Sequence, residues 1–120
     1  MMKEKLFDLE ERLVRFAGEV IIFCNTLPKT PTGLYYADQI MRSSGSAALN
    51  YGEAQGTNTS KDFIYKMSLV LKELKETRVS HKILTYVNMG DQTKREWLLK
   101  EVNELVPISA KIIQNRKNRK

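Results

Sequence analysis

Several residue types are scarce in this 120-residue chain, and each scarcity removes a class of protein. The one cysteine, Cys24, cannot form an intrachain disulfide, which is typical of a reducing compartment. No apolar run approaches the roughly 18 residues of a membrane span, and the charged N-terminal residues do not resemble a secretory signal. We therefore expect a cytoplasmic protein with no membrane partner.

Motifs for catalysis and for metal binding are also absent. The sequence contains no Gly-x-x-x-x-Gly-Lys or Gly-x-Gly-x-x-Gly motif for nucleotides. A di-iron bundle needs Glu-x-x-His on two helices, whereas the one histidine, His81, follows Arg78, Val79 and Ser80. Cys24 has apolar neighbours, as a small core residue does. We expect no enzyme activity, no catalytic residue, no cofactor and no metal, and we interpret His81 as a core or interface histidine with satisfied hydrogen bonds.

Helical periodicity, in contrast, is abundant. Apolar residues recur at helical spacing near residues 5–27, 31–55, 60–87 and 93–115, and Pro- or Gly-containing breaks separate these stretches. The third stretch carries a heptad seam, in which apolar or small residues alternate in steps of four and three. Its members are Phe63, Met67, Val70, Leu74, Thr77, His81 and Leu84. The pattern predicts an all-α protein, an antiparallel up-down-up-down four-helix bundle over residues 1–115 with a basic C-terminal tail at 116–120.

The ends of the helices can be predicted from capping residues. Thr30 is suited to cap the second helix with Pro31 at its first position, and Ser60 to cap the third. Gly90 is suited to a left-handed C-cap, and the last helix should begin near Thr93. We expect residues 43–48 to be helical despite their serines and glycine, because the apolar period continues across them. On the last helix the expected seam comprises Leu98, Val102, Leu105, Ser109 and Ile112.

A second apolar set lies on the third helix, to one side of the heptad seam. It comprises Ile64, Leu71, Val79, Ile83 and Tyr86. A helix in a monomeric bundle needs only one apolar stripe, so this set predicts an interface between copies in a homo-oligomer. The alternative is that a wide bundle face covers some of these residues.

Polar residues form a row on one face of the second helix, and residues of the third helix, among them Lys72, Glu73 and Glu76, are placed to meet it. The row comprises Gln39, Arg42, Ser46, Asn50 and Glu53. One reading is a ligand or catalytic site in which Glu53 and Glu73 are paired carboxylates. We interpret the row together with Glu73 as a structural polar network that fixes helix register, because no nucleophile or second histidine accompanies it.

Positive charge is concentrated in two places. The last ten residues hold no acid and five of the charges behind the net +6, on Lys111, Arg116, Lys117, Arg119 and Lys120. Such a segment binds phosphates without sequence specificity. A second group, Lys72, Lys75, Arg78 and Lys82, spans about a third of a turn of the third helix. This stripe is either a second nucleic-acid contact or a solvated face.

From Phe16 to Thr77 the sequence resembles the bacterial four-helix bundle protein family, also called the 23S rRNA intervening-sequence protein family. The residues that carry the resemblance are Leu27-Pro28-Lys29-Thr30, Gln39, Arg42-Ser43, Ser46, Asn50-Tyr51, Glu53-Ala54, Asp62-Phe63-Ile64, Lys66, Lys72-Glu73-Leu74 and Glu76-Thr77. Gly52 departs from the family pattern, which has a charged residue there, and Arg78, Val79 and Ser80 stand where an aromatic usually follows.

The resemblance implies an antiparallel bundle that forms a ring-like homo-oligomer, typically a pentamer. It also implies a gene within an insertion of a large-subunit ribosomal RNA gene, and a relation to the accessory proteins of diversity-generating retroelements, which bind nucleic acid and a reverse transcriptase. Together with the basic segments it favours a non-enzymatic protein that binds RNA or DNA, with RNA preferred. The alternative is a protein-interaction scaffold whose ring binds a partner protein and has no nucleic-acid role.

Overall fold

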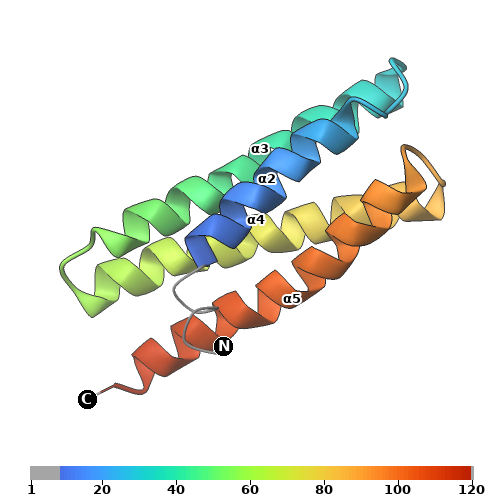
Figure 1. The fold of residues 1–120 in the computed structure, drawn as a ribbon. Coiled ribbons are helices and arrows are strands. Elements are labelled where there is room, and N and C mark those ends of the chain that lie inside the picture. The colour runs from blue at the N-terminus through green and yellow to red at the C-terminus, as the bar shows by residue number, and fades with distance from the viewer. Residues whose placement is uncertain (1–8, 120) are drawn as a thin grey trace.

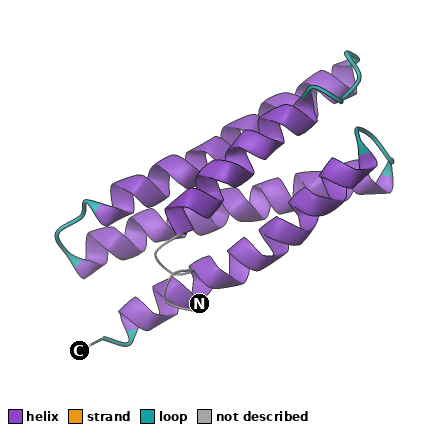
Figure 2. Cartoon of the chain, viewed as in Figure 1, coloured by secondary structure: helices purple, strands orange, loops and turns teal. Residues whose placement is uncertain are grey.

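The computed structural model describes residues 9–119, in which every regular element is an α-helix. The helices are α2 (Leu9–Cys24), α3 (Pro31–Gln55), α4 (Ser60–Tyr86) and α5 (Gln92–Lys117). Figure 1 shows the chain reversing direction at each connection, and Figure 2 shows the short loops between the helices. The predicted all-α four-helix fold is confirmed. Residues 5–8, which the prediction included in the first helix, lie outside the described residues.

The start of α3 agrees with the sequence prediction. The Thr30 hydroxyl accepts a hydrogen bond from the Gly33 amide at 3.2 Å, and Pro31 occupies the first helical position. Gly33 is buried against the loop that precedes the helix, and a Cβ at this position would overlap the carbonyl oxygen of Pro28. The α2–α3 connection therefore depends on glycine at position 33.

The starts of α4 and α5 differ slightly from the prediction. Thr59, and not Ser60, caps α4, because its hydroxyl accepts from the amide three residues on at 3.1 Å. Asp91 caps α5 in the same way at 2.9 Å, so this helix begins one residue before Thr93. The correction for α4 follows from two adjacent residues with similar capping ability, between which sequence alone does not choose. The start of α5 agrees with the prediction to within one residue.

The end of α4 is set by Asn88, and not by Gly90. Asn88 adopts the left-handed conformation with φ 55°, and the following amide, of Met89, donates to the Leu84 carbonyl at 3.0 Å. This is the Schellman arrangement. Gly90 is also left-handed, with φ 84°, and an added Cβ would lie 2.7 Å from ring carbons of Phe23. Gly90 therefore lets the α4–α5 turn lie against the end of α2.

The core lies along the seam that the sequence predicted on α4. All seven seam residues, from Phe63 to Leu84, are buried. On α5 the seam holds as far as Ser109, but the next buried residue is Ile113, while Ile112 is only half-buried. Pro107 lies within α5, where it has no amide to donate to the preceding turn. The expected place of Ile112 in the seam is thus wrong by one residue.

Small polar residues bring α3 and α4 together. Residues 43–48 are helical, as predicted, and Ser43 and Ser44 are buried. The hydroxyls of Ser43 and Thr77 lie 2.6 Å apart in a hydrogen bond across the two helices. Further along, Glu53 on α3 pairs with Lys66 on α4, so residue numbers run in opposite directions and the two helices are antiparallel. The small side chains allow the close approach.

Polar contacts tie α2 to α5. The Arg12 guanidinium donates to Glu101 at 3.0 and 3.1 Å and to Glu104 at 3.0 Å. The hydrogen bond to Glu101 is the main cause of the raised pKa of Arg12, which keeps this side chain charged. Beside it, the Arg15 guanidinium lies 4.9 Å from the centre of the Trp97 ring. These contacts close the bundle on its α2–α5 side.

Two basic side chains are buried at the α4–α5 end of the core. His81 lies between the rings of Phe16 and Phe23, and neither of its ring nitrogens has a hydrogen-bond partner among residues 9–119. The expected core position is confirmed, but the expected hydrogen bonds are not made. Arg95, in contrast, donates to the backbone carbonyls of Met89 and Gly90 at 2.8 and 3.0 Å. Arg95 therefore holds the turn, whereas His81 acts as an apolar ring.

Cys24 is a core residue, as predicted. It is 8% exposed, and burial raises the pKa of its thiol to about 11, so the nucleophilic thiolate is disfavoured at neutral pH.

None of the helices in the described part of the chain is both long enough and apolar enough to cross a membrane.

Candidate nucleic-acid interface

The basic stripe on α4 is only partly free in the structure. Lys72, Lys75 and Lys82 are exposed. Arg78 is half-buried, and its Nε is enclosed without a hydrogen-bond partner among the described residues. The three lysines can therefore reach a phosphate backbone directly, whereas Arg78 is held closer to the bundle.

The predicted basic tail begins inside a helix. Because α5 runs to Lys117, residues 116 and 117 form its last turn, and only the residues after them leave it. Lys111, Lys117 and Arg119 are exposed. Lys120 lies outside the described residues. Most of the C-terminal charge is thus carried on a rigid helix end.

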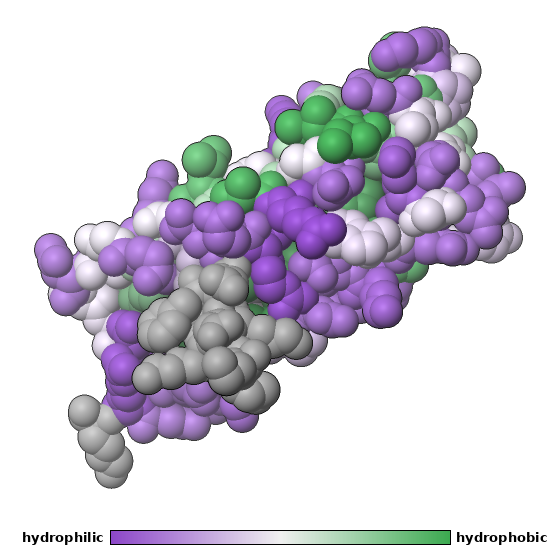
Figure 3. Space-filling view, in the orientation of Figure 1, coloured by the Kyte–Doolittle hydropathy of each residue, from purple (hydrophilic) through white to green (hydrophobic). Residues whose placement is uncertain are grey.

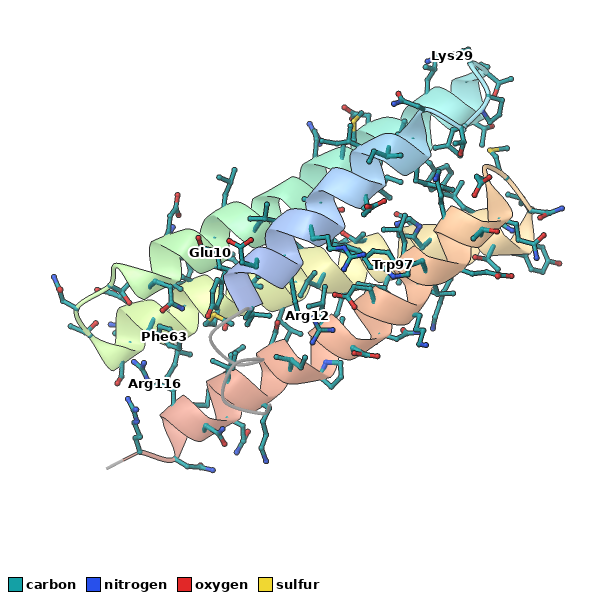
Figure 4. All side chains as sticks on the ribbon, in the orientation of Figure 1. Glu10, Arg12, Lys29, Phe63, Trp97 and Arg116 are labelled. Atoms are coloured by element: carbon teal, nitrogen blue, oxygen red, sulfur yellow. The ribbon has the colours of Figure 1, made fainter. Side chains whose placement is uncertain are left out.

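Arg116 differs from the other basic residues because it packs on an aromatic ring. Its guanidinium carbon lies 3.9 Å from the centre of the Phe63 ring, at the beginning of α4 (Figure 4). A cation over an aromatic face is stabilised by the ring quadrupole. Deleting the chain from residue 116 would uncover Phe63, so the bundle does not end cleanly at residue 115.

The basic candidates within residues 9–119 form no ion pair, although Lys72 lies close enough to Glu73 to act on its pKa. Between residues 9 and 119, ion pairs involve the cations of Arg12, Arg42 and Lys66. None involves a basic candidate on α4 or at the end of α5. Their charges are therefore available to an external anion.

The polar row on α3 faces a hollow shared with α4. The hollow has a volume of about 280 Å³ and is lined by Gln39, Arg42, Ser43, Ser46, Glu73 and Glu76. Asn50 lies one turn further along and donates to the Ser46 carbonyl and hydroxyl at 2.9 and 3.1 Å. Four of the six residues predicted as a network therefore meet at one place, and Asn50 is hydrogen-bonded to that group.

The pair of carboxylates in this hollow is Glu73 with Glu76, and not Glu73 with Glu53. Burial raises the pKa of Glu73, and the nearby Glu76 raises it further, while Lys72 and Arg42 act in the opposite sense. Glu73 and Glu76 are three residues apart on one helix, and this spacing alone places them next to each other on its surface. The alternative reading that paired Glu53 with Glu73 is wrong.

Glu53 forms an exposed ion pair with Lys66, at 2.7 Å, instead of contacting Arg42 or Lys72. The Glu53 side chain is 59% exposed, so water competes for the pair. We expect Glu53→Ala to leave the midpoint of thermal unfolding close to that of the wild type. Ser43→Val, which removes the buried hydrogen bond to Thr77, should lower it clearly in the same calorimetric experiment. A large fall in the unfolding midpoint of Glu53→Ala would contradict the exposed position of this ion pair.

The predicted oligomer surface separates into two parts. Val79, Ile83 and Tyr86 are exposed, Tyr86 by 91%. Ile64 and Leu71 instead pack against the core of the same chain. The bundle itself thus covers two of the five candidates, and the other three are left as exposed apolar surface.

Another apolar surface, on α2 and α3, was not found from the sequence. Its members are Val14, Ile21, Leu34, Met41 and Leu49, all classed among the exposed large hydrophobic residues. Figure 3 shows hydrophobic patches over these two helices.

The described residues contain no group of three or more His, Cys, Asp and Glu side chains placed to hold a metal ion.

Comparisons with known proteins agree with this architecture. A family model described as "23S rRNA-intervening sequence protein" matches residues 7–111. A crystal structure of a protein of unknown function from the S23 ribosomal protein family of Bacteroides thetaiotaomicron is similar in fold, with a TM-score of 0.79 and 24% sequence identity. The similarity covers 88% of this chain and 97% of that one. No curated protein matches the chain.

Proposed function

The chain belongs to the 23S rRNA-intervening sequence protein family, and from this premise we propose that it is a non-enzymatic, cytoplasmic, oligomeric protein that binds nucleic acid, with RNA preferred. The observation that carries the proposal is a group of exposed cations that form no ion pair within residues 9–119. It comprises Lys72, Lys75 and Lys82 on α4, and Lys111, Lys117 and Arg119 at the end of α5. Such charges bind phosphates and release condensed counterions.

The family description names an intervening sequence of 23S rRNA and states no ligand, so we infer a polyanionic partner from charge. A neutral or acidic surface would argue against any polyanion, but the chain carries a net charge of +6. Half or more of the hydrogen bonds in nucleic-acid complexes go to the backbone, which needs cations and no base-reading motif.

Oligomer formation is supported by two separate exposed apolar surfaces, Val79–Ile83–Tyr86 on α4 and the second set on α2 and α3. A ring of identical subunits needs two different patches that face each other, since its contacts are head-to-tail. A pentamer, which the sequence resemblance implies, is one such ring. It would also place several basic α5 ends on one particle, which raises the avidity for a long strand.

We expect Val79→Glu to reduce the assembly to a monomer of 13.9 kDa by light scattering, because it places a charge in a desolvated contact. Val79 is 54% exposed in one chain, so the helical circular dichroism signal should be retained. Asn103→Glu, which adds the same charge at an exposed site on α5, is the matched control and should remain oligomeric. Wild-type protein that is already monomeric at micromolar concentration would refute the oligomer.

A protein-interaction scaffold is the second candidate. The observation that favours it is the same set of exposed apolar residues on α2 and α3, a kind of surface that partner proteins bind. The two candidates differ in their response to salt, because apolar contacts do not weaken as salt rises.

The experiment that tests the proposal is a salt series of binding to structured RNA, duplex DNA and single strands. We expect the logarithm of the binding constant to fall linearly with the logarithm of the salt concentration. The slope should be about 0.9 for each duplex phosphate contacted and about 0.7 for each single-strand phosphate. Structured RNA should bind at least as tightly as DNA. No detectable binding at low salt would refute the nucleic-acid function and leave the scaffold.

A further inference from the structure

A small hollow lies where the beginning of α4 meets the end of α5. It has a volume of about 240 Å³ and is lined by Phe63, Ile112, Asn115, Arg116 and Arg119. Phe63 belongs to the first turn of α4, and the other residues belong to the last turns of α5 and the chain just beyond it. Two helix ends far apart in sequence therefore build one site.

The lining combines two chemistries. Ile112 and the edge of the buried Phe63 ring supply apolar surface, while the Asn115 amide and the guanidinium groups of Arg116 and Arg119 supply N–H donors. The arginines have no carboxylate partner among the described residues. Their donors are consequently free for a ligand.

The arginine nearest the ring is held in a defined position. The Arg116 guanidinium lies over the Phe63 ring at 3.9 Å, and Figure 4 shows the two side chains together between α4 and α5. A guanidinium placed in this way pays less entropy on binding than a free lysine, and it keeps a planar fork of donors that fits a phosphate. The contact thus pre-arranges the donor.

An inorganic anion alone would use the arginines but gain nothing from the apolar surface. An apolar ligand would use Phe63 and Ile112 but would leave the arginines without a role. A nucleotide has both parts, a flat base and a charged phosphate. In a duplex the bases are stacked on each other, so only an unpaired base can reach the apolar surface.

We propose that this hollow binds one unpaired nucleotide of a single-stranded or looped nucleic acid, with the base stacked on the outer face of the Arg116 guanidinium beside Ile112 and the phosphate at Arg119. The inference rests on the proposed nucleic-acid function and adds to it a site and a preference for unpaired strands. The lysines of α4 and α5 supply the general attraction to phosphate, and the hollow supplies the contact to a base.

The test compares an oligouridylate of about ten nucleotides, within the usual range of single-strand site sizes, with an abasic strand of the same phosphate count. Wild-type protein should bind the abasic strand at least about fivefold more weakly, the loss expected from one stacked base. Arg116→Lys and Arg119→Lys keep the charge and lose the planar fork, so both should reduce affinity for oligouridylate. Lys29→Arg is the charge-preserving control, at an exposed site at the opposite end of the bundle, and should bind as the wild type does.

The outcomes separate the hollow from the general function. Equal affinity for oligouridylate and the abasic strand, or wild-type affinity in both arginine variants, would overturn the hollow while leaving nucleic-acid binding intact. Failure of the wild type to bind any strand at low salt would overturn the proposed function itself. Arg119 lies beyond the last helical residue, so its variant keeps the test valid even if Arg116→Lys unfolds the helix end.

Discussion

Replacing Lys111, Lys117 and Arg119 with glutamine should weaken binding to duplex nucleic acid by roughly two orders of magnitude at about 0.1 M salt. These side chains are exposed and have no acidic partner among residues 9–119, so each can contact a phosphate. In a salt series the slope should fall by nearly three units if all three contacts are lost. Arg116 is left in place because it covers Phe63.

The matched control for this variant removes three positive charges elsewhere. Lys29, Lys94 and Lys100 are exposed, and Figure 4 shows Lys29 at the opposite end of the bundle from Arg116. Their replacement by glutamine should change the affinity much less. Equal losses in both triple variants would mean that net charge alone attracts the nucleic acid, and would remove the end of α5 as a defined interface.

Lowering the pH from about 7.5 to about 5 should cost about 2 kcal/mol of unfolding free energy through His81. Burial, with a smaller contribution from the positive charge of Arg95, lowers the pKa of this histidine from 6.5 to about 4. The unfolded chain therefore binds the proton more readily than the folded one between these two pKa values. Stability from this group is complete above pH 6.5 and is lost as the pH falls toward 4.

Urea unfolding of wild type and His81→Leu, at one fixed protein concentration, measures this effect as a difference between the two proteins. The leucine variant should lack the pH-dependent loss of unfolding free energy that the histidine causes. At pH 7.5 its unfolding free energy should be close to that of the wild type, because neither ring nitrogen of His81 has a hydrogen-bond partner among the described residues. Glu73 works in the opposite sense, since its raised pKa favours the folded state in acid, and the difference cancels it. If the unfolding free energies of the two proteins changed with pH in parallel, the buried neutral state of His81 would be contradicted.

The sequence predicted best where one pattern decides the structure. On α4 the heptad seam from Phe63 to Leu84 fixed which residues are buried, because this helix packs against both α3 and α5. On α5 the same rule failed at its far end. From Ser109 the next buried position is reached by a step of four residues, to Ile113, and not by the step of three that continues the heptad pattern.

Contacts between helices were harder to predict than the helices themselves. The partner of Glu53 is Lys66, which depends on how far α3 is shifted along α4, and periodicity within one helix does not contain that shift. The stacking of Arg116 on Phe63 joins residues 53 positions apart in the chain, so the C-terminal cations were read as a free tail. The sequence identified the residue types of the basic interface, while the structure placed Arg116 and Arg119 in a hollow with an aromatic ring.

Native mass spectrometry of the protein mixed with a single-stranded RNA of about ten nucleotides tests oligomeric nucleic-acid binding most directly. The account predicts a complex whose protein mass is a multiple of 13.9 kDa and which carries bound RNA that is released as salt rises. A 13.9 kDa monomer, or an oligomer that remains free of RNA at low salt, would contradict it.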